Sequence, residues 1–256
     1  FRSPQTYDED LHVAIVGGDR VVTILAPGLK QESSQSISAS ADLYPRFGNV
    51  QTNFLIEGFY TDLRDVFALR QLPDPDAAGN TVLERYNGSG AHVAGMNLEA
   101  KAFFSSSLDV QAGVTIQRSR YKQPEHWSDN PDVPAVKRMF RTPDVYGYLT
   151  ANIGITKAFK ATVDATWTGP MTVQHLVGPG PDVDLAVRTP HFFDASVRFT
   201  YCFRIFNRVD LDVSAGVGNI FNSYQNDFDR GPDRDSGYIY GPALPRTVSA
   251  AVSISI

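Results

Sequence analysis

The final stretch of the chain, RTVSAAVSISI (residues 246–256), decides the fold. From Val248 onward every second residue is apolar, and the residues between them are small and mildly polar. Because alternate side chains of a β-strand point to opposite sides, the pattern predicts a strand with two different faces. In a soluble sheet the apolar face would line a core, whereas in a membrane β-barrel it would face lipid.

The same alternation recurs along most of the chain. Its period of two residues indicates strands and disfavours amphipathic helices, whose period is 3.6. We therefore predict an all-β, antiparallel fold with about nine strands of about 7–13 residues. The predicted strands cover residues 37–43, 50–60, 96–102, 108–117, 145–153, 159–167, 193–203, 209–218 and 247–256.

The connections between these strands alternate in length. Short connections are expected at 44–49, 105–107, 156–158 and 204–208. Long ones, rich in Pro, Gly, Asp and Arg, fall at roughly 61–80, 121–143, 168–190 and 219–246. Strict alternation places every long loop on one side, which is typical of bacterial outer-membrane barrels with short periplasmic turns and long extracellular loops. A soluble sandwich has no reason to place all its long connections at one end.

The two faces of the predicted strands differ in composition. Ala, Val, Leu and Ile dominate one face, as expected of a lipid-facing band, and aromatic residues near strand ends fit interfacial girdles. The expected girdle residues are Tyr60, Phe103, Trp167, Phe193, Tyr201 and Phe203. The other face carries mixed charges that suit an aqueous lumen, namely Glu57, Glu99, Lys101, Lys160, Asp164, Asp194, Arg198, Asp210 and Asp212.

Composition narrows the class of protein further. The chain has 256 residues, a net charge of −5 and a single cysteine, Cys202. The negative charge argues against a nucleic-acid partner, and one cysteine allows neither an intramolecular disulfide nor a cysteine-based metal site. No apolar run approaches the roughly 18 residues of a spanning helix. Neither a nucleophile elbow nor a phosphate-binding loop occurs.

Six segments, taken in order, resemble the TonB-dependent outer-membrane receptors of Gram-negative bacteria. They are FRSPQ (1–5), PGLKQESSQSISASADLY (27–44), EGFYTDLRDVF (57–67), RYNGSGAHVAGMNLEAKAFF (85–104), GVGNIFNSYQ (216–225) and LPRTVSAAVSISI (244–256). The resemblance implies a barrel of about 22 strands with an N-terminal plug and a TonB box. Residues 1–256 would then be the C-terminal portion of that barrel, without the plug and the N-terminal strands.

One long loop combines cations with aromatic residues, which suits an anionic or chelated ligand at the mouth of a barrel. The ligand-binding candidates are Arg118, Arg120, Tyr121, His126, Trp127, Arg138, Arg141 and, from another long loop, His175. The alternative interpretation is a solvated outer loop whose cations meet lipopolysaccharide phosphates.

A second loop, NDFDRGPDRDSG (226–237), is rich in acids. Alternate carboxylates around Gly231 are the kind of ligand that Ca²⁺ prefers, although the EF-hand spacing fails. The candidate ligands are Asp227, Asp229, Asp233 and Asp235. Arg230 and Arg234 could instead neutralise these acids in a salt-bridged loop. We expect no other cofactor.

Three functions remain open. The first is a receptor for active uptake of a large, scarce solute such as an iron–siderophore, a cobalamin or a glycan. Because TonB would drive such uptake by pulling on the plug, we expect this part to be no enzyme. Its expected partners are the TonB complex through the plug, the extracellular solute, outer-membrane lipid and lipopolysaccharide, and a surface lipoprotein. The second is a passive porin-like or structural outer-membrane barrel. The third is a soluble carbohydrate-binding β-sandwich.

Overall fold

The computed structural model describes residues 2–4, 21–128, 130, 132–176, 184–205, 209–231, 234–235 and 237–255. These residues form sixteen β-strands in one large sheet and two small ones. No helix among them is long and apolar enough to cross a membrane. The large sheet has the strand order β16-β15-β14-β11-β10-β8-β7-β4-β2, with β3 paired to β4 and β9 paired to β8 at its margins.

The nine strands of this order are the nine that the alternation predicts, and every neighbouring pair is antiparallel. They are β2 (Ser33–Leu43), β4 (Val50–Arg64), β7 (Ala91–Ser105), β8 (Leu108–Glu125), β10 (Val145–Gly154), β11 (Phe159–Thr168), β14 (Phe192–Ile205), β15 (Val209–Gly218) and β16 (Thr247–Ser255). Four of them, β2, β4, β7 and β8, run several residues past their predicted ends on the side of the long loops. Their pairing continues there, with Leu63 opposite Ala91 and Ala91 opposite Tyr121.

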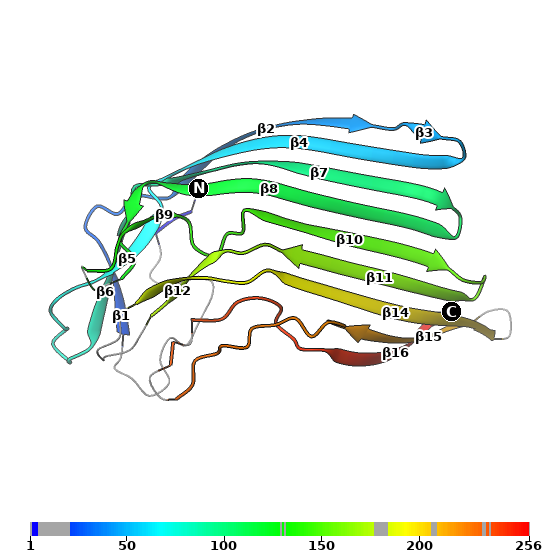
Figure 1. Cartoon of the computed structure of the whole chain (residues 1–256). Helices are drawn as coiled ribbons and strands as arrows, with labels where there is room; N and C mark the ends of the chain where they lie inside the picture. The colour runs from blue at the N-terminus through cyan, green and yellow to red at the C-terminus, as the bar shows by residue number, and fades with distance from the viewer. Residues whose placement is uncertain are drawn as a thin grey trace.

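The predicted alternation of short and long connections is confirmed. All the long connections leave the sheet at one end, on the left in Figure 1, and the short ones lie at the other end. The short connection between β2 and β4 contains β3 (Arg46–Phe47). We call the two ends of the sheet the long-loop end and the short-turn end.

The long connections contain strands that the sequence analysis treats as loops. They are β5 (Phe67–Gln71), β6 (Thr81–Asn87), β9 (Val136–Arg138), β12 (Thr172–His175) and β13 (Leu185–Arg188). A further strand, β1 (Val21–Leu25), pairs with β6 in parallel, and this is an exception to the predicted antiparallel fold. The order β1-β6-β5 forms a small sheet at the long-loop end, and β12 pairs with β13 in a second one. Each of these strands is too short to show a clear alternation in sequence.

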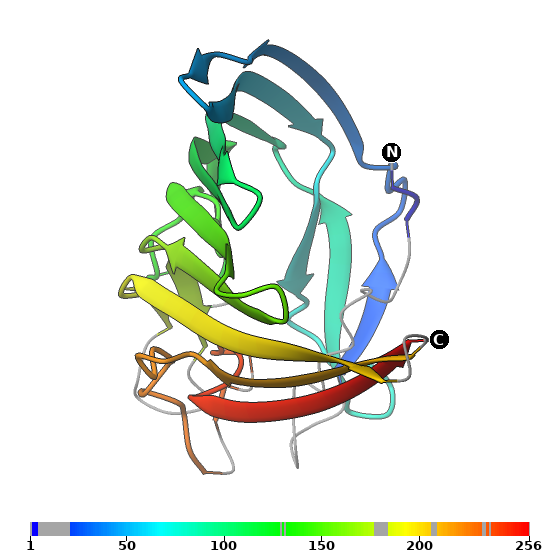
Figure 2. The ribbon, with the colours of Figure 1, turned by 90° about the vertical axis from the view of Figure 1, so that its right-hand side faces the viewer.

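The large sheet is strongly curved, so it has a convex and a concave face (Figure 2). The apolar residues share the convex face, as the row Ala112, Leu149 and Ala165 across β8, β10 and β11 illustrates. No second layer of described residues covers this face, since Ile37 is 72% and Val248 is 78% exposed. A soluble β-sandwich requires the apolar faces to be buried between two sheets, so the sandwich alternative is wrong.

One predicted girdle residue faces the other way. Phe103 shares a row with Gln51 and Asp109, which places it on the concave, polar face. Its neighbour Phe104 is also about half exposed, and the register of β7 and β8 shifts between Phe103 and Ser105. The sequence prediction failed at this residue because two adjacent phenylalanines sit at the end of the strand, where the alternation breaks.

The concave face is joined laterally by hydrogen bonds between polar side chains. Asn97 donates to Glu57 at 2.8 Å and accepts from the Thr115 hydroxyl at 2.8 Å, which links β4, β7 and β8. Asn152 on β10 likewise donates to Asp109 on β8 at 2.9 Å. The predicted polar face is therefore confirmed, and its groups satisfy one another across neighbouring strands.

The large sheet does not close on itself. Its order begins with β16 and ends with β2, and no strand of the described ranges pairs with the outer side of either. The arc seen in Figure 2 is therefore part of a barrel wall, with the concave side toward the lumen.

Candidate functional site: the cavity at the long-loop end

The small sheet β1-β6-β5 is fixed to the large sheet by polar side chains. Asn87 at the end of β6 donates to the carbonyls of Lys30 at 2.9 Å and Asp65 at 2.7 Å, and its own carbonyl accepts from the Lys30 amide at 2.8 Å. Glu32 accepts a short hydrogen bond from the Phe67 amide at the start of β5. A single amide side chain thus joins three separate segments, which gives the small sheet a defined position.

A cavity of about 530 Å³ lies between this small sheet, the long-loop end of β8 and the end of β12. One of its walls is cationic and aromatic. The guanidinium groups of Arg2 and Arg85 lie 5.7 Å and 5.9 Å from the centre of the Phe67 ring. Arg85 is only 2% exposed, so its charge acts in a poorly solvated environment, where electrostatic interactions are strong.

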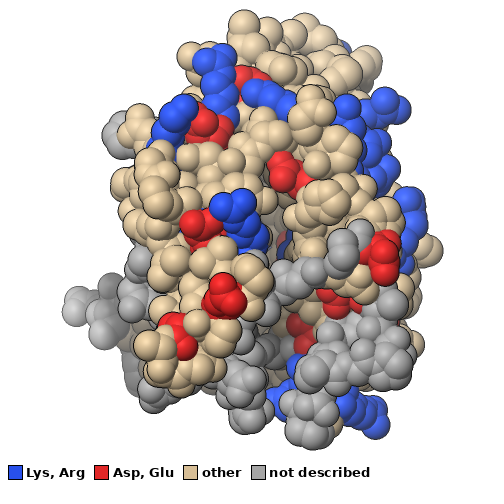
Figure 3. All heavy atoms as spheres, turned by 90° about the vertical axis from the view of Figure 1, so that its left-hand side faces the viewer, with Lys and Arg blue, Asp and Glu red and all other residues tan. Residues whose placement is uncertain are grey.

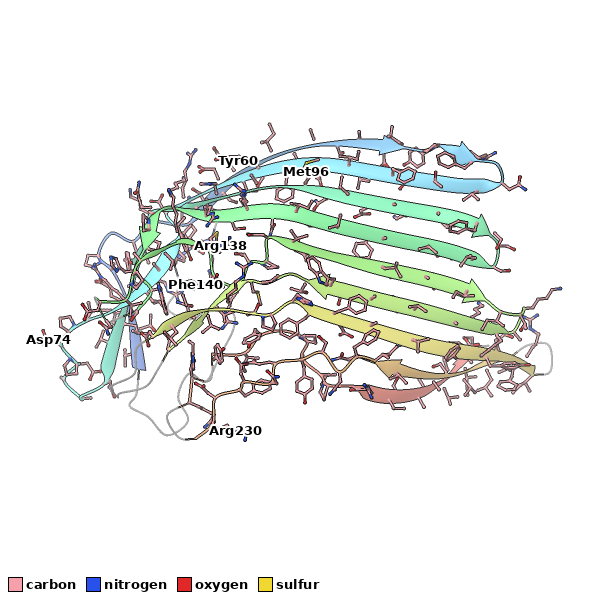
Figure 4. The ribbon with its side chains drawn as sticks, viewed as in Figure 1. Tyr60, Asp74, Met96, Arg138, Phe140 and Arg230 are labelled. Carbon is pink, nitrogen blue, oxygen red and sulfur yellow. The ribbon has the colours of Figure 1, made fainter. Side chains whose placement is uncertain are left out.

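Trp127 and Phe140 line another part of the cavity. Their rings meet edge to face, with centroids 5.3 Å apart, and the Trp127 indole donates to the Pro134 carbonyl at 3.2 Å. Phe140 lies at the long-loop end of the sheet (Figure 4). Two acids also line the cavity, and both accept hydrogen bonds from serines: Glu125 from Ser89 at 2.6 Å and Asp184 from Ser128 at 2.5 Å.

The structure brings together three of the predicted ligand-binding residues. Tyr121, His126 and Trp127 all line this cavity. Arg118 and Arg120 lie on the other side of β8. They follow Ile116 by two and four residues, so their side chains point to the same convex, apolar face as that of Ile116. The continuous loop that the sequence suggested as one site is thus divided between the two faces of the barrel wall.

The other predicted cations are engaged within the loops. Arg138 forms an ion pair with Asp144 at 2.8 Å. Arg141 donates to the carbonyls of Ile239, at 2.8 Å, and Gly237, which ties the second long loop along the chain to the last one. Its backbone has φ +57°, in the left-handed region that only glycine adopts without strain.

His175 does not line the cavity, although its neighbours Gln174 and Leu176 do. Its imidazole stacks on Tyr238 with ring centroids 4.0 Å apart, and its Nε2 lies 2.8 Å from Asp229. Tyr238 belongs to a small buried core with Val173, Phe192 and Tyr240. The contact therefore docks the end of β12 onto the last long loop.

Two acids of this loop are held in their charged form. Burial opposes the charge of Asp227, but the hydroxyls of Tyr240 at 2.6 Å and Tyr238 at 2.8 Å donate to it, so its pKa lies below the ordinary value. Burial likewise opposes the charge of Asp229, and the bond with His175 outweighs it and lowers the pKa of that carboxyl. Burial and the bond to Asp227 raise the pKa of Tyr240, which keeps its hydroxyl protonated.

The predicted calcium loop stays a prediction. The carboxylate of Asp235 accepts from the backbone amides of Leu176 and Gly237, each at 2.8 Å, and Asp233 lies outside the described residues. Within the described ranges, no group of three or more His, Cys, Asp or Glu side chains is arranged to hold a metal ion.

Sequence reasoning missed the small-sheet half of the cavity. Phe67 and Arg85 are brought together by the antiparallel pairing of β5 with β6, and Arg2 joins them through its bridge to Glu32, which also binds the Phe67 amide. Contacts between segments as far apart as Arg2 and Phe67 leave no local pattern in a sequence. The one available signal is that both Arg85 and Phe67 belong to the quoted segments that resemble the receptor family.

Comparisons with known proteins agree with this architecture. Residues 1–244 match the family model described as TonB dependent receptor-like, beta-barrel. A comparison with curated protein sequences finds no match.

Solved structures share the fold at low identity. The ferric-catecholate import receptor Fiu from K12 E. coli superposes with a TM-score of 0.58 and 17% identity over 88% of this chain and 28% of that one. The FrpB iron transporter from Neisseria meningitidis (F5-1 variant) gives 0.58 and 15% over 91% and 33%. The ferripyoverdine receptor of Pseudomonas aeruginosa gives 0.58 and 17% over 86% and 27%.

The chain thus spans about a third or less of the length of these structures. Proteins of this kind reside in the outer membrane of Gram-negative bacteria, which agrees with the exposed apolar convex face. The family match covers nearly all of the chain, and its curved sheet of alternating strands is that of a barrel wall. The chain belongs to the TonB-dependent receptor family and forms part of its outer-membrane β-barrel.

Proposed function

We propose that this chain is part of a receptor for TonB-dependent uptake, and that the receptor binds its solute in the cavity at the long-loop end. The plug and the remaining strands belong to the rest of that receptor, and the TonB complex acts through the plug. The family match supports uptake driven by TonB over a passive or structural barrel. A receptor of this kind is a transporter and carries out no chemistry on its solute.

The composition of the cavity carries the choice of solute. Arg2 and Arg85 flank the Phe67 ring on one wall, and the edge-to-face pair of Trp127 and Phe140 lines another. An anionic iron chelate with aromatic groups fits such a site, because its charge is attracted to the arginines and its rings stack on the aromatic side chains. A cavity of about 530 Å³ is within the range of small-molecule sites. A cobalamin or a neutral glycan would make less use of the cations.

The experiment uses the complete receptor expressed in a strain that lacks its own siderophore receptors. Uptake of a radiolabelled ferric tricatecholate is measured with and without a functional TonB, alongside cyanocobalamin and a neutral oligosaccharide. We expect TonB-dependent uptake of the ferric chelate alone. Uptake that is indifferent to TonB would overturn the transport proposal, and preferential uptake of either other probe would overturn the choice of solute.

A pair of tryptophans tests the site itself. Trp127→Ala removes an aromatic side chain from the cavity, and we expect the affinity for the chelate to fall about tenfold. Trp167→Ala is the matched control, because Trp167 shares the convex face with Phe193 and Gly147. The control variant should bind as the unmodified protein does. Equal losses in both variants would contradict the location of the site.

A further inference from the structure

The solute cavity is lined by charges of both signs. Apart from a histidine, the charged side chains among its described lining residues are Arg2, Arg85, Glu125 and Asp184. Figure 3 looks onto the long-loop end and shows acidic side chains set between basic ones. A solute that carries only negative charge would be attracted to the two arginines and repelled by the two acids. Attraction of an anion to the arginines therefore explains only half of the lining charge.

The carboxylate of Glu125, at the end of β8, is held in a fixed position. Its Oε1 accepts hydrogen bonds from the Ser89 amide at 2.8 Å and from the Ser89 hydroxyl at 2.6 Å. A Cβ at Gly88 would lie only 3.1 Å from the same oxygen, so this glycine gives the carboxylate room beside the backbone that follows β6. The negative charge is thus in place before a solute arrives, which lowers the cost of binding a cation there.

Glu125 has no cationic partner among the described residues. It forms no ion pair with any of them, and none of them donates a hydrogen bond to its Oε2. Of the two arginines that line the cavity, Arg2 pairs instead with Glu32 at 3.7 Å. The half-buried carboxylate of Glu125 is therefore partly desolvated without a compensating charge, and a charged donor is the partner that satisfies it best.

The kind of donor follows from the surroundings of Glu125. A metal ion such as Ca²⁺ needs about six to eight oxygen ligands. In the part of the chain that the structure describes, no group of three or more acidic, His or Cys side chains is arranged to supply them. An ammonium group offers three N–H donors and a full positive charge. Trp127 and Phe140 line the same cavity, and the faces of such rings attract cations as well.

We propose that the solute is a zwitterionic iron chelate, which carries an ammonium group beside its anionic, aromatic chelating groups. The anionic part lies toward Arg2 and Arg85, and the ammonium group binds Glu125. Glu125 then sets the specificity of the cavity, because its charge attracts chelates with such a group and repels chelates without one. The inference rests on the proposed uptake function and narrows the class of solute.

The test compares two ferric tricatecholates that differ in one substituent. One carries an arm that ends in a methyl group, and the other carries an arm of the same length that ends in an ammonium group. The complete receptor is purified in detergent, and the Kd of each chelate is measured from the quenching of tryptophan fluorescence. We expect the ammonium chelate to bind the unmodified receptor about tenfold more tightly, because it forms a charge-assisted hydrogen bond.

The variant Glu125→Gln removes the charge and keeps an oxygen that can accept from Ser89. We expect the two chelates to bind this variant equally. The methyl chelate should bind it more tightly than it binds the unmodified receptor, since the repulsion is gone. A purely structural role of Glu125 would instead weaken the binding of both chelates. The heat-dependent migration of each variant on gels confirms that its barrel is folded.

Two controls make the result specific. Glu99→Gln loses the same charge on the concave face, but Glu99 lies opposite Gly113, and the stretch of β8 from there to Glu125 is about 40 Å long. This variant should keep the full preference for the ammonium chelate. A third chelate, whose arm ends in a hydroxyl group, should bind clearly less tightly than the ammonium chelate, because it offers a donor without a charge.

The outcomes separate this inference from the proposed function. Equal affinity of the methyl and ammonium chelates for the unmodified receptor would overturn the inference and leave the proposed function standing. A preference that survives in Glu125→Gln, that is lost in Glu99→Gln, or that the hydroxyl chelate shares would also overturn the inference. If neither chelate bound the unmodified receptor, the proposed function itself would be wrong, and the inference with it.

Discussion

Two glycines of the concave face leave room for aromatic rings of the neighbouring strand. Gly113 lies opposite Tyr148, and a Cβ at Gly113 would approach the Tyr148 ring to 2.5 Å. The Tyr148 hydroxyl accepts from Gln111 at 2.6 Å, so the ring extends along β8 over the glycine. Gly95 and Phe59 repeat the arrangement between β7 and β4, with 2.6 Å to the ring. Each ring covers backbone that a side chain would otherwise cover.

Gly113→Ala is therefore expected to destabilise the barrel. The added methyl group overpacks a ring that its hydrogen bond to Gln111 holds in place, a kind of change that costs about 1–3 kcal/mol. Gly58→Ala is the matched control, since nothing lies within 4 Å of its Cβ position, and its effect should stay within about 0.5 kcal/mol. Urea unfolding in detergent measures both.

A double-mutant cycle separates crowding from backbone effects. If the ring causes the loss, Gly113→Ala should cost little in a background that already carries Tyr148→Ala. A full cost in that background would show that the glycine backbone itself is required, and it would contradict the proposed packing.

Residue identity alone indicated some of the cavity. Tyr121, His126 and Trp127 follow one another closely in a loop that combines cations with aromatic residues, and that local signal was sufficient. Arg118 and Arg120 belong to the same loop signal, yet they lie on the convex face because alternation continues to the end of β8. Continuing the alternation past Ile116 would have placed Arg118 and Arg120 on the apolar face and so separated them from the cavity residues.

The elements could be predicted where they are long. Alternation over seven or more residues identified all nine strands of the barrel wall, because lipid on one side and water on the other impose a strict pattern. The strands of the long loops, β5, β6, β9, β12 and β13, have only three to seven residues each. Although β5 pairs with β6, β9 with β8 and β12 with β13 along the chain, runs this short show no clear alternation, so the sequence did not predict them.

The last long loop docks onto β12 as a unit. His175 stacks on Tyr238, Tyr238 and Tyr240 donate to Asp227, and Arg141 donates to the carbonyls of Gly237 and Ile239. Gln225, which is almost fully buried, donates to the Tyr238 carbonyl at 3.0 Å and accepts from the Tyr240 amide at 3.0 Å. This docking sets the shape of one side of the long-loop end.

The docking should weaken in acid. Asp227 and Asp229 have pKa values below their ordinary value of 3.8, so they stabilise the docked loop above that value. The contribution is lost as the pH falls through the lowered pKa values. A fluorescent probe on Asn226→Cys, in a Cys202→Ser background, should show constant anisotropy from about pH 8 to pH 5 and a fall below about pH 4.

Asp227→Asn gives the control for this measurement. The variant should be more mobile at neutral pH, and the acid transition that remains belongs to Asp229. A loss of anisotropy that is already complete above about pH 5 would contradict the assignment to the two carboxylates.

At the scale of the whole molecule, the described strands form an open arc whose two outer edges pair with no other described strand. The outer sides of β2 and β16 carry backbone N–H and C=O groups that lipid cannot satisfy, and each unsatisfied group in hydrocarbon is costly. An arc of this kind is stable in a membrane only when other strands pair with both edges. Closure of the barrel by such strands also explains why every strand from β16 to β2 carries apolar residues on its convex face, since each strand of a closed barrel faces lipid.

The orientation of the arc in the membrane gives the last prediction. If the long loops are extracellular, a cysteine at Asp74, which lies at the far left of the molecule in Figure 4, reacts with a membrane-impermeant maleimide on intact cells. A cysteine at Lys157, in the exposed turn between β10 and β11, should react only after the outer membrane is opened. Both are introduced into the complete receptor together with Cys202→Ser. Cys202 lies on the concave face beside Asp212, where its thiol would face the lumen and could react with the maleimide itself. Labelling of Lys157→Cys on intact cells, with Asp74→Cys protected, would reverse the barrel. The solute cavity at the long-loop end would then face the periplasm, where an extracellular chelate could not reach it.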